Sequence, residues 1–174
     1  MTEGNPIKKG FSTSAQVAGL LALSLLVVLG LFFSRAQVQP GHYQAENLPR
    51  TTGSVVLNLH AAFGREVCGK PGQPGALIYG PYDWYEPGEY KTSFYLSTEA
   101  APNTVVGRVE VSDAKTGAII ASGDIINTET GEVRFVYQLI FSLGQASQLE
   151  FRVWYYGVDR LCVDQVITQL TADR

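Results

Sequence analysis

The sequence predicts an all-β protein, an antiparallel β-sandwich of the jelly-roll kind, preceded by one N-terminal transmembrane helix. Three observations support this prediction. One uncharged apolar run lies near the N-terminus, apolar residues alternate with a period of two through the remainder, and turn residues recur between the alternating stretches. With 174 residues, the chain is long enough for one domain and such an extension.

The N-terminal run is apolar and long. Residues 10–34 carry no charge, and residues 17–33 read VAGLLALSLLVVLGLFF. At about 1.5 Å per residue this stretch spans roughly 26 Å, and its uncharged flanks extend it to the thickness of a hydrocarbon core. Lys8 and Lys9 precede it, so the positive-inside rule places the N-terminus in the cytoplasm and the rest outside.

A cleaved signal peptide is the alternative, because Ser34, Arg35 and Ala36 offer a possible cleavage site before Gln37. The apolar run exceeds the roughly 7–15 residues of a signal-peptide core, which favours a retained signal anchor. Both interpretations export residues 37–174. The expected parts are a cytoplasmic N-terminus (1–10), a transmembrane signal anchor (11–34), a linker (35–41), an extracytoplasmic β domain (42–170) and a tail (171–174).

The exported part alternates between apolar and polar residues. One face is shared by Tyr90, Thr92, Phe94 and Leu96, another by Val133, Phe135, Tyr137, Leu139, Phe141 and Leu143, and a third by Leu149, Phe151, Val153 and Tyr155. Such alternation is typical of strands with one buried face. Further strands are expected at 43–47, 54–59, 76–80, 104–112, 118–126 and 161–169, separated by turns such as DAKTGA, NTETGE and SLGQAS.

Charge and cysteine content narrow the function classes. Residues 37–174 carry ten Lys and Arg against fifteen Asp and Glu, a net charge of −5, which argues against nucleic acid or an anionic membrane surface as a partner. Two cysteines, Cys68 and Cys162, are too few for a zinc-thiolate framework. In an oxidising compartment they are expected either to form a disulfide or to remain as two buried thiols.

Residues 78–90, IYGPYDWYEPGEY, concentrate aromatic side chains between turn formers. Tyr79 and Tyr90 fall in expected strands, whereas Trp84 and Tyr85 fall in the middle of an expected loop. Sugar rings stack their C–H faces on aromatic rings, while acids orient the sugar hydroxyls. The candidate ligand-binding residues are therefore Tyr82, Asp83, Trp84 and Tyr85, with Glu86 beside them; the alternative is that these rings cap one end of the sandwich.

Trp154 and Tyr156 form a second aromatic pair. They lie on the face opposite Phe151, Val153 and Tyr155, where they are either a contact surface or ordinary cross-strand neighbours.

Three segments of the chain resemble a known family. YQAENLPRTTGSVV, YGPYDWYEPGEYKTSFYL and LEFRVWYYGVDRLCVDQV, in this order over residues 42–170, are similar to carbohydrate-binding modules of the family 6 and family 35 type. The resemblance implies a galactose-binding-like jelly roll and a structural Ca²⁺ ion. Its ligands would be Glu46 and Asp164, with Gln44 where a second carboxylate commonly stands; the alternative is that both acids bond to backbone groups or face solvent.

Signals for catalysis are weak. The sequence contains no G-x-S-x-G, H-E-x-x-H or P-loop motif, so we expect no enzyme. The leading hypothesis is a membrane-anchored module that recognises a glycan or an envelope polymer. The alternative is a single-span accessory subunit that binds other membrane-protein subunits and places its β domain on their outer face; a glycosidase ranks last.

Overall fold

The structure, a computed structural model, describes residues 41–172. The predicted membrane anchor lies outside these residues. Within them, no helix has the length and apolar character needed to cross a bilayer.

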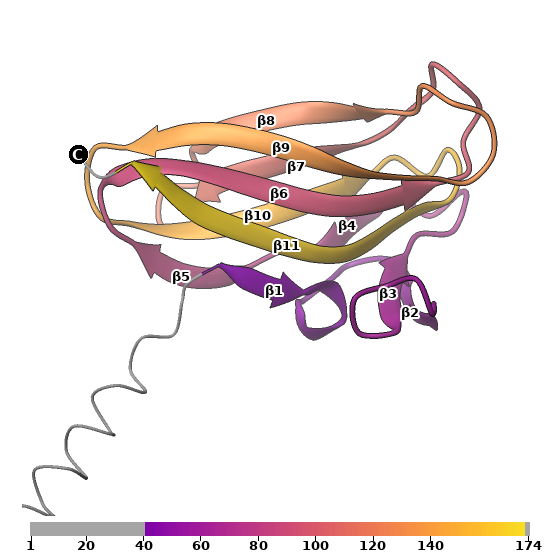
Figure 1. Ribbon diagram of the computed structural model, residues 1–174, viewed down its shortest axis with the longest axis horizontal. Helices are drawn as coiled ribbons and strands as arrows, with labels where there is room; N and C mark the ends of the chain where they lie inside the picture. The colour runs from indigo at the N-terminus through magenta and orange to yellow at the C-terminus, as the bar shows by residue number, and fades with distance from the viewer. Residues whose placement is uncertain (1–40, 173–174) are drawn as a thin grey trace, which may run out of the picture. The chain divides into compact units, whose positions relative to one another are not determined.

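Two antiparallel sheets face each other (Figure 1). The five-stranded sheet contains β4 (Gly75–Ile78), β10 (Ser147–Tyr155), β7 (Val105–Asp113) and β8 (Ile119–Ile126) in this order, and β5 (Pro81–Tyr85) also pairs with β10. The six-stranded sheet contains β2 (Ser54–Leu57), β3 (Arg65–Cys68), β11 (Leu161–Ala172), β6 (Gly88–Thr98) and β9 (Val133–Leu143), and β1 (His42–Gln44) also pairs with β11. One 3₁₀ turn, η1 (Ala45–Asn47), follows β1. The predicted all-β sandwich is confirmed.

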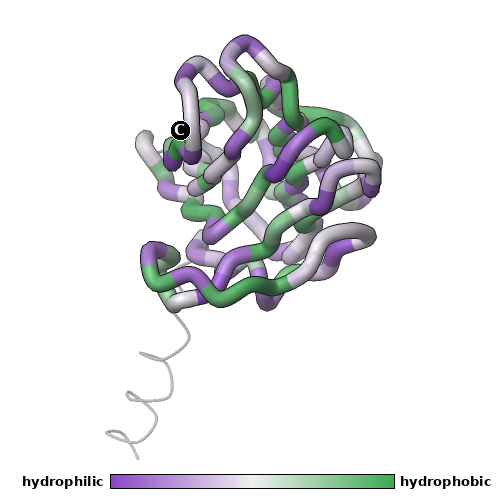
Figure 2. The backbone as a smooth tube through the Cα atoms, turned by 90° about the vertical axis from the view of Figure 1, so that its right-hand side faces the viewer, coloured by the Kyte–Doolittle hydropathy of each residue, from purple (hydrophilic) through white to green (hydrophobic). Residues whose placement is uncertain are grey.

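Alternation along the long strands builds the core between the sheets. In β10, the four apolar side chains at 149, 151, 153 and 155 are buried. In β9, the inward residues are buried or half-buried, while Arg134, Val136, Gln138 and Ile140 are exposed. Hydrophobic and hydrophilic residues are interspersed along the chain (Figure 2). The hydrophobic effect therefore fixes which face of each strand points outward.

Two short strands were not predicted, and three were predicted too far toward their C-terminal ends. The strands expected at 54–59 and 76–80 end at Leu57 and Ile78, which leaves Tyr79 outside β4. β3 has four residues, too few for an alternating pattern to be recognised. β5 lies in the segment that was expected to be a loop. Pro81 is compatible with a strand because it is the first residue of β5, an edge strand that pairs with β10 alone. The strand expected at 43–47 ends at Gln44, where η1 begins.

Cys68 and Cys162 form a disulfide between β3 and β11, which decides between the two alternatives left by the sequence. The two cysteines are direct partners in the register of these antiparallel strands. The bond links positions 94 residues apart and ties the short β3 to the central strand of its sheet.

We predict that the disulfide stabilises the domain by constraining the unfolded chain. In the chain-entropy model, a loop of this length contributes about 4–5 kcal/mol. Urea unfolding with and without a thiol reductant measures this difference. Reduction should destabilise the wild type but leave the double variant Cys68→Ala/Cys162→Ala unchanged; equal stability of the oxidised and reduced wild type would contradict the prediction.

Candidate functional site

The outward face of β10 brings several of the predicted site residues together. Trp84 of β5 lies opposite Gln148, and Glu110 of β7 lies opposite Arg152. We call this surface the β10 face. Its members are Tyr82, Trp84, Glu110, Glu150, Arg152 and Trp154.

A hydrogen-bonded network holds two of the three rings of the β10 face, those of Tyr82 and Trp154. The Trp154 indole N–H donates to Glu110 Oε2 over 2.9 Å, and the Tyr82 hydroxyl donates to Glu150 Oε1 over 3.2 Å. The Arg152 guanidinium pairs with the Glu150 carboxylate and lies 3.7 Å from Glu110 Oε2. Because both carboxylates are buried, this pairing offsets much of their loss of hydration.

The same network fixes the charge state of two donors. Burial, together with the neighbouring Glu150 carboxylate, raises the pKa of the Tyr82 phenol. The hydrogen bond to Glu150 raises the pKa of the Arg152 guanidinium. At neutral pH the face therefore presents a protonated hydroxyl and a cation beside its aromatic rings.

The rings remain accessible to a ligand. Trp84 is 61% exposed and Tyr82 is 39% exposed, while Trp154 is half-buried. A hollow of about 340 Å³ is lined by Thr51, Ala76, Tyr79, Tyr82, Glu150, Arg152 and Trp154. A second hollow, of about 390 Å³, is lined by Trp84, Asp113, Lys115, Thr116, Gln145, Ala146, Ser147 and Gln148. Tyr156, just beyond β10, is also exposed.

The structure corrects the expected place of Tyr85. Its ring is 2% exposed and contacts Phe151 and Tyr90 at centroid distances of 5.9 and 5.5 Å. The Tyr85 hydroxyl lies 2.7 Å from that of Tyr43, and burial is the main cause that raises the pKa of Tyr85 to about 12. Tyr85 is a core residue because β5 continues the sheet and alternation turns every second side chain inward.

Asp83 also lies away from the β10 face. Its carboxylate accepts a hydrogen bond of 2.9 Å from the Tyr43 hydroxyl, next to Tyr85. Sequence reasoning missed Glu110, Glu150 and Arg152 as members of the site. The outward direction of Glu150 and Arg152 follows from the alternation in β10, whereas the place of Glu110 depends on the register between β7 and β10, which the sequence does not reveal.

The predicted metal ligands lie on neighbouring elements. Asp164 of β11 accepts the Ala62 N–H with both carboxylate oxygens, at 3.2 and 3.1 Å. Gln44 Oε1 and Glu46 Oε2 are buried, and neither has a hydrogen-bond partner among the described residues. Burial is the main cause that raises the pKa of Asp164, and the nearby Glu66 and Glu46 carboxylates add to it. Buried oxygens without partners, near a second carboxylate, fit the oxygen ligands that Ca²⁺ prefers.

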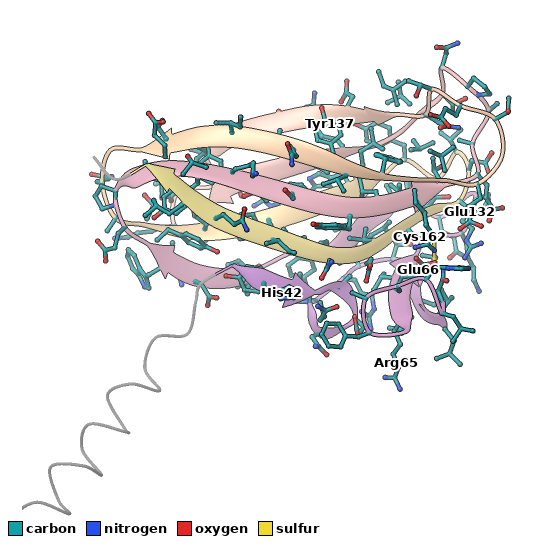
Figure 3. All side chains as sticks on the ribbon, in the orientation of Figure 1. His42, Arg65, Glu66, Glu132, Tyr137 and Cys162 are labelled. Carbon is teal, nitrogen blue, oxygen red and sulfur yellow. A yellow bond between two sulfur atoms is a disulfide. The ribbon has the colours of Figure 1, made fainter. Side chains whose placement is uncertain are left out.

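Glu66 and the two cysteines form another cluster, with ligand atoms within 4.8 Å of one another (Figure 3). The sulfur atoms are bonded to each other and are not thiolate ligands. The Glu66 carboxylate accepts a 2.8 Å hydrogen bond from Asn58 and pairs with Arg134 and Arg160 at 3.4 and 3.6 Å. This buried acid therefore has a structural role in joining β3 to its neighbours.

No family model matches this sequence, and no curated protein matches it significantly. Solved structures do share its fold. The C-terminal family 6 carbohydrate-binding module of LamC, a marine laminarinase from Zobellia galactanivorans, aligns with 74% of this chain and 97% of its own, at a TM-score of 0.54 and 11% identity. A family 35 module from Clostridium thermocellum aligns with 75% of this chain and 97% of its own, at a TM-score of 0.52 and 18% identity.

A third similar structure is a family 6 module of lichenase 5A from Cellvibrio mixtus, in complex with cellotriose. It aligns with 75% of this chain and 96% of its own, at a TM-score of 0.50 and 14% identity. At these identities the comparisons establish the fold: the chain has the β-sandwich of carbohydrate-binding modules. The predicted resemblance is confirmed at that level.

We predict opposite effects on stability for two adjacent aromatic residues. Tyr85→Ala should lower the free energy of unfolding by about 3–5 kcal/mol, because it empties a core site. Trp84→Ala should change it by about 0.5 kcal/mol or less, because the ring is exposed. Urea unfolding of both variants tests this, and a large loss for Trp84→Ala would place its ring in the core.

Proposed function

We propose that the protein is a membrane-anchored, extracytoplasmic and non-catalytic module that binds a glycan or envelope polymer through the β10 face. The observation that carries this proposal is the set of three accessible aromatic rings on one sheet face, two of which are held by a buried polar network. The fold shared with carbohydrate-binding modules supports it.

The chemistry of the β10 face suits a sugar. The rings of Trp84, Tyr82 and Trp154 offer apolar surfaces for stacking, and Arg152 offers N–H donors for hydroxyl groups. Because the network holds Tyr82 and Trp154 in place, binding requires little further loss of side-chain freedom.

The spacing of the rings suits an extended ligand. Trp84 pairs with Gln148, and Trp154 lies six residues further along β10. At about 3.3 Å per residue these positions are roughly 20 Å apart, with Tyr82 beside the stretch between them. A polymer chain lying along β10 would contact all three rings, whereas a single sugar would contact one.

The acids of the β10 face favour binding over catalysis. A glycosidase needs one carboxylic acid free to donate a proton and a second carboxylate facing the sugar. Here Glu110 and Glu150 are both engaged, by Trp154, Tyr82 and Arg152. The anchor at residues 11–34 and the extracytoplasmic location are proposals that rest on the apolar N-terminal sequence and its preceding lysines.

Trp84→Ala tests the glycan-binding proposal. Loss of one stacking ring should weaken binding by about tenfold without a change in melting temperature. The full chain in detergent is probed on an array of bacterial, fungal and plant glycans, and the affinity for the selected oligosaccharide is then measured by calorimetry.

The matched control is Ile140→Ala, which truncates an exposed side chain on the other sheet. This variant should bind as the wild type does. If Trp84→Ala binds the oligosaccharide with wild-type affinity, the proposal that the β10 face is the binding site is contradicted. The accessory-subunit hypothesis would then be preferred.

We also propose that Gln44, Glu46 and Asp164 hold a structural Ca²⁺ ion, with backbone carbonyls and water completing the shell. Bound there, the ion would link η1 to β11 and supply the partners that two buried oxygens lack.

Chelation tests the calcium proposal. Excess chelator should lower the melting temperature of the wild type, because an ion that binds only the folded state stabilises it. Asp164→Asn should remove this difference, while Asp124→Asn, which changes an exposed acid on β8, should keep it. A wild-type melting curve that does not respond to chelator would contradict the site.

A further inference from the structure

The end of β2 and the loop between β2 and β3 carry large apolar side chains that are exposed among the described residues. Leu57 is 84% exposed, Leu59 is 97% exposed and Phe63 is 65% exposed. Single exposed apolar residues are common on protein surfaces, but here three that are each at least 65% exposed fall within seven residues of one hairpin, and we call them the apolar patch. We call residues 57–65 the apolar hairpin.

The apolar hairpin has a defined conformation. Asn58 N–H donates to the Gly64 carbonyl over 2.9 Å, and Ala61 N–H donates to the Asn58 carbonyl over 3.0 Å. The Ala62 N–H donates a hydrogen bond to the Asp164 carboxylate of β11. Several backbone N–H groups of the loop therefore bond within the loop or to β11, and these bonds define its conformation.

The apolar hairpin lies beside the point where the chain enters the domain. The ring of Phe63 is 6.4 Å from that of His42, the first residue of β1. β1 and β3 both pair with β11, and β1 and the β2–β3 hairpin lie along the same side of the domain (Figure 1). Seven residues, 35–41, separate the proposed anchor from His42 and span at most about 25 Å when extended, so an anchor at residues 11–34 would keep the hairpin near the bilayer.

The charges next to the patch suit a lipid surface. Residues 57–65 include no acid, and Arg65 is exposed and points away from the sandwich (Figure 3). The acids nearest to the hairpin are engaged: Glu66 is buried and paired with two arginines, and the half-buried Asp164 accepts the Ala62 N–H. The exported part as a whole carries a net charge of −5, so the apolar side chains, and not charge attraction, would supply the contact with the acyl boundary of a membrane. The adjacent arginine suits the phosphate groups of the lipid headgroups.

We propose that the apolar hairpin is a membrane-contact element whose Leu57, Leu59 and Phe63 insert into the interface of the bilayer. This inference rests on the proposed membrane anchor. The tether keeps the hairpin at a high effective concentration near the lipid, so an interaction too weak to recruit a free protein is sufficient to dock the domain.

Depth-dependent quenching tests the inference. Leu59→Cys is labelled with an environment-sensitive fluorophore in the full chain, in which the two native cysteines are already bonded to each other. The labelled protein is reconstituted into nanodiscs of phosphatidylcholine and phosphatidylglycerol containing nitroxide-labelled lipid. Emission from position 59 should shift to the blue and be lost to quenching. The matched control, Lys115→Cys in the exposed turn between β7 and β8, should keep its emission.

Retention of the chain is measured separately by alkaline extraction and intact mass. Release from the bilayer, or a mature N-terminus at Gln37, would overturn the anchor and this inference with it. A retained chain whose label at position 59 stays in water would overturn the inference alone. A label shielded from water but not quenched by lipid would assign the hairpin to a protein partner and would also overturn it.

Discussion

The two-sided pattern of β10 is the constraint on which both the core and the candidate site depend. Its inward side chains, at 149, 151, 153 and 155, are fully buried between the sheets. Since side chains alternate along a strand, burial of this set forces Glu150, Arg152 and Trp154 to the outward face. A shift of one residue in the register would place two charges in the core, so the stability of the fold specifies the geometry of the β10 face.

The β10 face contains two acids, Glu110 and Glu150, whose burial costs free energy. Two buried carboxylates next to each other are tolerated only if they are paired, and Arg152 lies between Glu110 and Glu150. The indole of Trp154 and the hydroxyl of Tyr82 satisfy further carboxylate oxygens. The groups that satisfy these acids are thus the groups that the proposed ligand would meet, so the polar network and the proposed recognition depend on the same side chains.

Sequence reasoning succeeded where a pattern was long and failed where structure depended on tertiary pairing. β6, β9 and β10 are long enough for alternation to be read directly, and Trp154 could be placed outward from that alone. β3 and β5 are short and pair with strands distant in sequence, so Tyr85 was expected in a loop. The contact between His42 and Phe63 likewise depends on β11, which brings together two segments that share no local signal.

Indole resonances test the role of the β10 face most directly. The chain contains two tryptophans, and Trp84 and Trp154 both lie on this face. In the full chain labelled with ¹⁵N-tryptophan, titration with the oligosaccharide selected on the array should shift both indole signals with one shared dissociation constant. Binding of that oligosaccharide with both indole signals unmoved would contradict the account.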